Sequence, residues 1–262
     1  MGILLLKLLI TPFLLTGTTL ATRRWGPSVG GWLVGLPLTS GPVSFFLAVE
    51  QGRAFAATAA HGAINGLGPV IIFCMVYEKC ASRLSWPLAT ASALGGYFTG
   101  VVLFSHLHLS FWASLGLVCG MISFAILCAK PVKHAATRLA APRWDLPLRM
   151  VAATGIVLAV TAVSATLGPN LSGIISVFPV FTCVMFAFSH GLYGAEATRA
   201  FEHGVVIGSY AFAAFFVIVA FTVQIWPLWA VYLAACVGAM TINALVYACM
   251  ARITRHWRTI TP

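Results

Sequence analysis

Long apolar segments recur along the 262 residues of this chain, and they limit its fold more than any other feature. Each is about 20 residues long, the length with which a helix crosses roughly 30 Å of hydrocarbon. Only 8% of the residues are charged, whereas soluble domains carry roughly 25%. Backbone groups inside lipid need partners within the protein, and the segments lack the alternation of barrel strands. We therefore expect membrane-spanning helices.

The pattern predicts an all-α polytopic membrane protein with nine transmembrane helices. Residues 2–20 have no basic start and are followed directly by Arg23 and Arg24, so we interpret them as a first span rather than a cleaved signal. The expected spans are 2–20, 28–49, 54–77, 87–107, 110–130, 146–166, 170–190, 197–222 and 228–250.

The basic residues are distributed unequally between the two sets of loops that these spans define. Thirteen Lys and Arg residues fall on one side, and only Lys7 and Arg53 fall on the other. Cytoplasmic loops are the basic ones, which predicts an outside N-terminus and an inside C-terminus in a bacterial inner (plasma) membrane. The basic loop 131–144 is expected to meet anionic lipid headgroups. It has no aromatic platform, so no nucleic-acid partner is expected.

A repeat becomes visible when the sequence is shifted by 142 residues. Residues 26–66 then match residues 168–208 at nine of 41 positions without a gap. The identical pairs are mostly Gly, Pro and His, namely Gly26/Gly168, Pro27/Pro169, Gly31/Gly173, Pro37/Pro179, Phe46/Phe188, Gly52/Gly194, His61/His203, Gly62/Gly204 and Gly66/Gly208.

The shift covers five spans, an odd number, so the two copies cross the membrane in opposite directions. Such inverted repeats are typical of secondary transporters. The expected domains are repeat 1 at 1–108, a linking span with the basic loop at 109–142, repeat 2 at 143–250 and a basic tail at 251–262. We expect a rotation of roughly 180° about an axis in the membrane plane to relate the repeats.

Proline and glycine interrupt the second and seventh spans at matching positions, Pro37 and Pro179. Breaks of this kind in transporter repeats indicate a binding site near the middle of the membrane. We expect the substrate to contact both breaks, the hydroxyl residues that follow them, Thr39, Ser40 and Thr182, and Asn65 within the third span. The alternative is that Gly and Pro serve only close helix packing.

Ionisable residues within spans are costly and usually face a cavity or a partner. His61 and His203 lie about two turns into spans three and eight, and Glu202 precedes His203. These three residues are the candidates for proton coupling. The alternative is a neutral histidine that hydrogen-bonds a neighbouring helix. Glu196 and Arg199 are three residues apart and are expected to pair.

The motif GIISVFPVF at 173–181, with its partner GWLVGLPLT at 31–39, resembles the GlpM-like family of small bacterial membrane proteins. The first copy departs from the motif at Thr39, where the second has Phe181. The resemblance implies a duplicated and fused version of a unit that would otherwise pair with an oppositely inserted copy. It implies no substrate.

The leading functional expectation is a secondary transporter or flippase for a small metabolite or lipid, with proton coupling as an option. The alternative is a non-transporting accessory or regulatory subunit, and an uncharacterised membrane enzyme ranks third. No cofactor, metal or enzymatic activity is expected, because the hydrolase, metalloprotease and nucleotide-binding signatures are missing. Membrane lipids are expected partners, and a homo-oligomer is left open.

Overall fold

The computed structural model of the chain describes residues 2–129, 142, 144–164 and 177–260. Within those ranges every regular element is a helix, so the predicted all-α class is confirmed there. The helices are α1 (Gly2–Trp25), α2 (Pro27–Val34), α3 (Ser40–Glu50), α4 (Arg53–Ala81), α5 (Trp86–His106), α6 (Phe111–Cys128), α7 (Asp145–Ser164), α9 (Val180–Thr222) and α10 (Leu228–Ile260).

Five of the described helices are long and apolar enough to cross a membrane. They are α4, α5, α6, α9 and the part of α10 from Leu228 to Cys249. The fold is thus compatible with a membrane protein. The count of nine spans stays a prediction, in part because the start of the expected span 170–190 lies outside the described residues.

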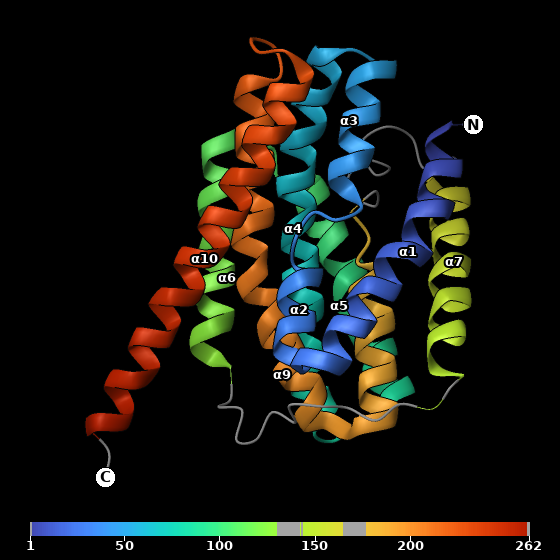
Figure 1. Cartoon of the computed structure of the whole chain (residues 1–262), viewed down its shortest axis with the longest axis vertical. Helices are drawn as coiled ribbons and strands as arrows, with labels where there is room; N and C mark the ends of the chain where they lie inside the picture. The colour runs from blue at the N-terminus through green and yellow to red at the C-terminus, as the bar shows by residue number, and fades with distance from the viewer. Residues whose placement is uncertain (1, 130–141, 143, 165–176, 261–262) are drawn as a thin grey trace.

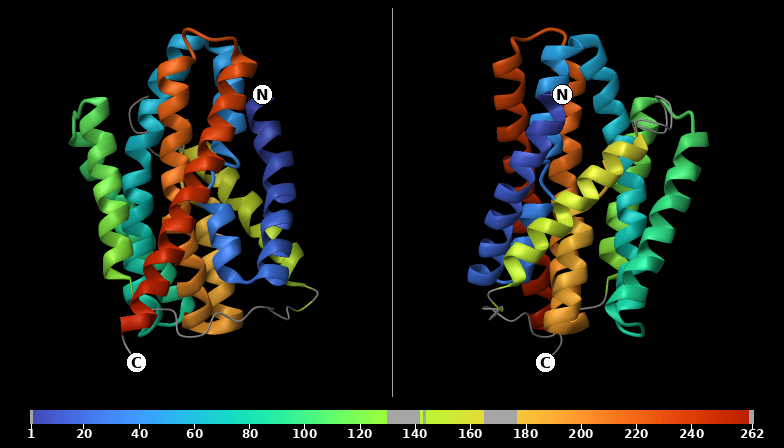
Figure 2. Two further views of the ribbon diagram at one scale, coloured as in Figure 1. Left: turned by 60° about the vertical axis from the view of Figure 1, so that its left-hand side comes forward. Right: turned by 90° about the vertical axis from the view of Figure 1, so that its right-hand side faces the viewer.

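The helices run mostly lengthwise along the molecule, as the two rotated views of Figure 2 show. α1 begins towards the upper end of Figure 1, and α10 ends at the lower end. "Upper" and "lower" refer to Figure 1 throughout. α9 packs against α2, α4 and α10, and α4 also packs against α5, so α4 and α9 form the centre of the molecule.

An aromatic cluster occupies this centre. The fully buried rings of Phe73 and Tyr77 on α4 lie against Phe186 on α9, with ring centroids 5.9 and 5.0 Å away. Phe201, further along α9, meets the same Phe186 ring edge-on. Edge-on aromatic pairs add to the free energy that their burial contributes, so these rings fix the position of α9 on α4.

α9 folds back on itself. Gly194 has non-helical dihedral angles, φ 81° and ψ 180°, within the 43 residues of the helix. The first arm, residues 180–193, descends from the middle of the molecule, and the second arm, residues 195–222, rises to the upper end (Figure 1). Only glycine adopts this conformation without strain, so the residue type explains where the chain turns.

Gly52 makes a matching bend between α3 and α4, with φ 89° and ψ 166°. Gly52 and Gly194 are 142 residues apart, at paired positions of the sequence repeat. α3 rises to this bend and α4 descends from it (Figure 1), opposite to the arms of α9.

The predicted interruption of segment 28–49 lies at residues 35–39, between α2 and α3. The backbone there forms short local hydrogen bonds, with the Leu38 amide donating to the Leu36 carbonyl over 2.8 Å. Pro179 precedes the first turn of α9 and caps it. Both helix ends therefore fall beside the prolines that the repeat places in register.

Glycines allow α2 to lie directly on the second arm of α9. A Cβ atom on Gly31 would overlap the Phe201 carbonyl, and one on Gly204 would overlap the Ser28 carbonyl. Gly35 and Gly208 approach each other in the same way, with a Cβ on Gly35 only 2.6 Å from the Gly208 Cα. Small residues at such spacing let helix backbones touch, and this contact holds the lower side of the α2–α3 break.

Candidate functional site

A cavity of about 170 Å³ lies between the α2–α3 break at residues 35–39 and the start of α9. Its wall includes residues on both sides of the α2–α3 break (the first break) and residues 177–182 around the start of α9. The remainder comes from α1, α4, α7 and the second arm of α9, through Thr11, Ala59, Ala63, Leu67, Val70, Val157, Val160, Val205, Ser209, Phe212 and Phe216.

The wall is mainly apolar and carries six hydroxyl side chains, those of Thr11, Thr39, Ser40, Ser44, Thr182 and Ser209. Two of these hydroxyls already have hydrogen-bond partners within the protein. The Ser44 hydroxyl lies 2.9 Å from the Tyr232 hydroxyl, and Ser209 donates to the Val205 carbonyl over 2.9 Å.

Three hydroxyls on the wall lie at the α2–α3 break or at the start of α9. Thr39 is the last residue of the break, Ser40 begins α3, and the buried Thr182 lies in the first turn of α9. Within the described part of the chain these three side chains form no hydrogen bond. They are therefore free to donate to, or accept from, a molecule in the cavity.

Four of the residues named from the sequence thus share one wall: Thr39, Ser40, Pro179 and Thr182. Pro37 lies in the first break but not on the wall, and Asn65 on α4 is also absent from it. The structure therefore brings together four of the six residues named for substrate binding and leaves Pro37 and Asn65 off the wall.

His61 lies apart from the cavity wall, on α4 facing α6. Its Nε2 atom is 3.2 Å from the Ser114 hydroxyl, and its ring lies 5.4 Å from that of Phe111. The histidine has the neighbouring-helix partner that the alternative interpretation expects.

His203 and Glu202 line a second, smaller cleft near the lower end, together with Glu78, Arg199, Ala125, Ala129 and Val206. Glu202 is buried, and Arg199 donates to Glu196 over 3.1 Å, which confirms the expected pair. α6 therefore lies beside His61 with its first half and beside His203 with its second half.

Sequence reasoning missed Glu78, which lies at the end of the expected span 54–77, beside Lys79. The structure places it with Glu202 at one cleft. The rarity of acidic residues could have identified it, because the chain has only five Asp and Glu in total.

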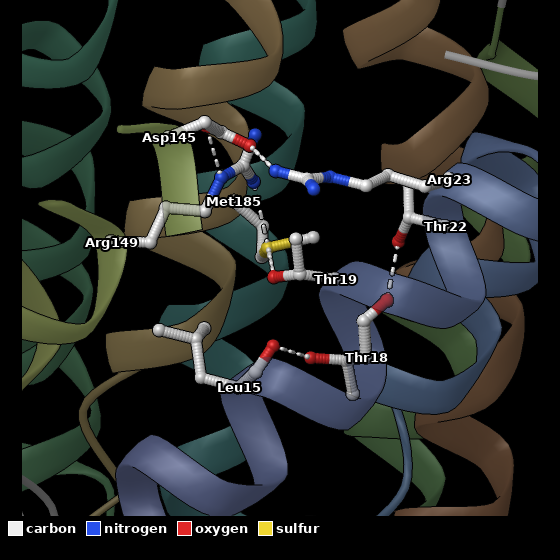
Figure 3. Close-up of polar contacts among 8 residues, drawn as sticks. All are labelled: Leu15, Thr18, Thr19, Thr22, Arg23, Asp145, Arg149 and Met185. Carbon is white, nitrogen blue, oxygen red and sulfur yellow. Dashed lines mark hydrogen bonds and ion pairs between the residues drawn. The ribbon is translucent and has the colours of Figure 1, made fainter. Parts of the chain in front are cut away.

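A buried ionic cluster joins α1, α7 and α9 near the lower end (Figure 3). Asp145 is fully buried and accepts from Arg23 over 2.8 Å and from Arg149 over 2.7 Å. Arg149 also contacts the Met185 sulfur and lies 5.0 Å over the Phe188 ring. Asp145 directly follows the basic loop 131–144 in the sequence, and sequence reasoning did not foresee this cluster.

The remaining polar contacts in Figure 3 are local. Thr18 and Thr22 donate to carbonyls one turn earlier on α1, and Thr19 donates to the Met185 sulfur over 3.6 Å. The protons of these hydroxyls are thus already donated within the protein.

The described residues contain no group of three or more His, Cys, Asp or Glu that could hold a metal ion. Comparisons with protein-family models, curated proteins and solved structures found no match, so the function must be inferred from the chain's own residues.

Proposed function

We propose that this protein is a secondary transporter that moves a small molecule across a bacterial inner membrane by alternating access. One observation carries the proposal: two helix ends, marked by prolines 142 residues apart, contribute free hydroxyls to the same cavity. In transporters, interrupted helices of this kind bind the substrate midway through the membrane.

The proposed architecture is nine crossings in two inverted repeats, 1–108 and 143–250. The matched bends at Gly52 and Gly194 support it, because the helices that flank them run in opposite directions. The positions of the first and last helix ends, at opposite ends of the molecule, suit an odd number of crossings.

The proposed orientation puts the lower end in the cytoplasm, with the N-terminus outside and the C-terminus inside. The basic set of loops contains Arg23, Lys79, Arg83 and Arg199. The other set contains Arg53, next to the upper bend at Gly52. This distribution follows the rule that cytoplasmic loops are basic.

Proton coupling is proposed to use the lower cleft, where Glu202 and Glu78 lie with His203. Two carboxyl groups close together in a low-dielectric site cannot both ionise easily, so such a site binds and releases a proton readily. His61 lies in the opposite half, where it could take part in the coupling while the cavity is open to the other side.

Purified protein in proteoliposomes tests transport directly. Vesicles are loaded with a metabolite extract, and mass spectrometry measures which compounds leave faster than from protein-free vesicles. The proposal expects that at least one compound leaves faster through the unaltered protein. Its exit should be slower through a double variant that combines Ser40→Ala with Thr182→Val. If the protein moves nothing and instead co-purifies with a fixed partner, it is the accessory subunit of the alternative hypothesis.

A further inference from the structure

We propose that the cavity between the breaks binds an uncharged, compact organic molecule with an apolar body and one to three hydrogen-bonding groups. The inference rests on the proposed function and specifies its substrate class. It removes lipids and ionic metabolites from the range of substrates that the sequence leaves open.

The first argument is charge. None of the described residues on the cavity wall has an ionisable side chain that could pair with an ion. A cation in an apolar site without an acidic side chain loses its hydration and gains no compensating partner. An anion would find only the partial positive charge at the starts of α3 and α9, which is smaller than a full countercharge, so the cavity favours a neutral molecule.

The nearby ionic groups do not change this conclusion. Arg149 is engaged by Asp145, Met185 and Phe188, and the cleft with Glu202 and His203 is lined by different residues from those of the cavity. A proton bound at that cleft would therefore be carried separately from the substrate.

The second argument is size. The cavity of about 170 Å³ is close to a protein cavity of about 150 Å³ known to hold benzene. A molecule with one small ring or a short chain fits, whereas a membrane lipid with two acyl chains does not. The cavity therefore cannot enclose a whole lipid in this conformation.

The third argument is the arrangement of polar groups. The free hydroxyls of Thr39, Ser40 and Thr182 lie at the α2–α3 break or at the start of α9, while α4, α7 and the second arm of α9 contribute mainly Val, Leu, Ala and Phe. A ligand with hydrogen-bonding groups at one end and a hydrocarbon body satisfies both parts of the wall. A polyol would leave hydroxyls facing apolar side chains, which costs free energy.

Three ring-matched probes test this class: benzyl alcohol, benzoate and benzylammonium. Each is titrated calorimetrically into the purified full-length protein in detergent, and the heat of mixing with protein-free micelles is subtracted. We expect saturable binding of one benzyl alcohol per chain, with both charged probes at least tenfold weaker. Equal or tighter binding of either charged probe would overturn the inference.

Variants locate the binding. Ser40→Ala combined with Thr182→Val removes two hydroxyls with little change in volume and should weaken benzyl alcohol binding three- to tenfold. Val43→Phe fills the cavity and should abolish it, while Val151→Phe, on an exposed face of α7, should leave it unchanged. Unaltered binding in a folded Val43→Phe protein places the probe elsewhere and refutes the inference.

The outcome is separable from that of the transport experiment. Selective binding of the neutral probe without any flux refutes transport and leaves the ligand class standing. Flux of a charged compound that Val43→Phe blocks supports transport and refutes the ligand class.

Discussion

At the scale of single residues, Asp145 shows what sequence reasoning could not reach. It is the only aspartate of the chain and stands beside a basic loop, where a solvated side chain is the ordinary expectation. Its partner Arg23 is 122 residues away in the sequence. A pairing over that distance depends on how α1 and α7 pack. Short sequence patterns do not predict such packing.

Replacing Asp145 with alanine should destabilise the protein. The change leaves Arg149 buried without its countercharge, a loss of about 3–5 kcal/mol for one partner of a buried pair. Unfolding in detergent with increasing dodecyl sulfate measures it. Glu196→Gln is the control, because the Glu196 side chain is 44% exposed and such pairs contribute about 1 kcal/mol or less. Equal losses in the two variants would mean that the cluster has no special role.

Glu202 provides a second test at this scale. Glu202→Gln keeps the size of the side chain and removes its ability to exchange a proton. In proteoliposomes, we expect a pH gradient to drive uptake by the unaltered protein and to have no effect on the variant. Exchange of substrate without a gradient should persist. A variant that still responds to the gradient would show that the proton travels elsewhere.

At the scale of helices, residue types predicted the interruption between α2 and α3 and explain the bend in α9. Gly35 and Pro37 make residues 35–39 a poor helix, and Gly194 allows α9 to turn. The sequence could not tell which turn of each helix would face the cavity. Asn65 illustrates this, since its place within the span made it a candidate although its side chain is not on the wall.

The glycine contact between α2 and α9 makes a prediction about packing. Gly204→Ala would push a methyl group into the backbone of Ser28 and Trp32, and overpacking of this kind costs about 1–3 kcal/mol. Gly116→Ala on α6 is the matched control, because a Cβ there meets nothing within 4 Å. Thermal unfolding in detergent should show a lower midpoint for Gly204→Ala alone. Two equal midpoints would contradict the close contact.

At the scale of the whole molecule, the sidedness of the loops tests the proposed topology. Single cysteines at Ile225 and Ser82, both in exposed turns at opposite ends of the molecule, are introduced into a cysteine-free variant. In intact cells an impermeant maleimide should label position 225 and not position 82. Labelling of position 82 from outside would reject the proposed orientation.

The central claim is that one cavity, formed at two helix breaks, opens to each side of the membrane in turn. The most direct measurement is the labelling of Ser40→Cys and of Thr182→Cys, each in the cysteine-free variant, with an impermeant maleimide added to one side of oriented vesicles at a time. The account predicts that each cysteine reacts from both sides, and that a bound substrate slows both reactions. Reaction from a single side only, or from neither, would contradict it.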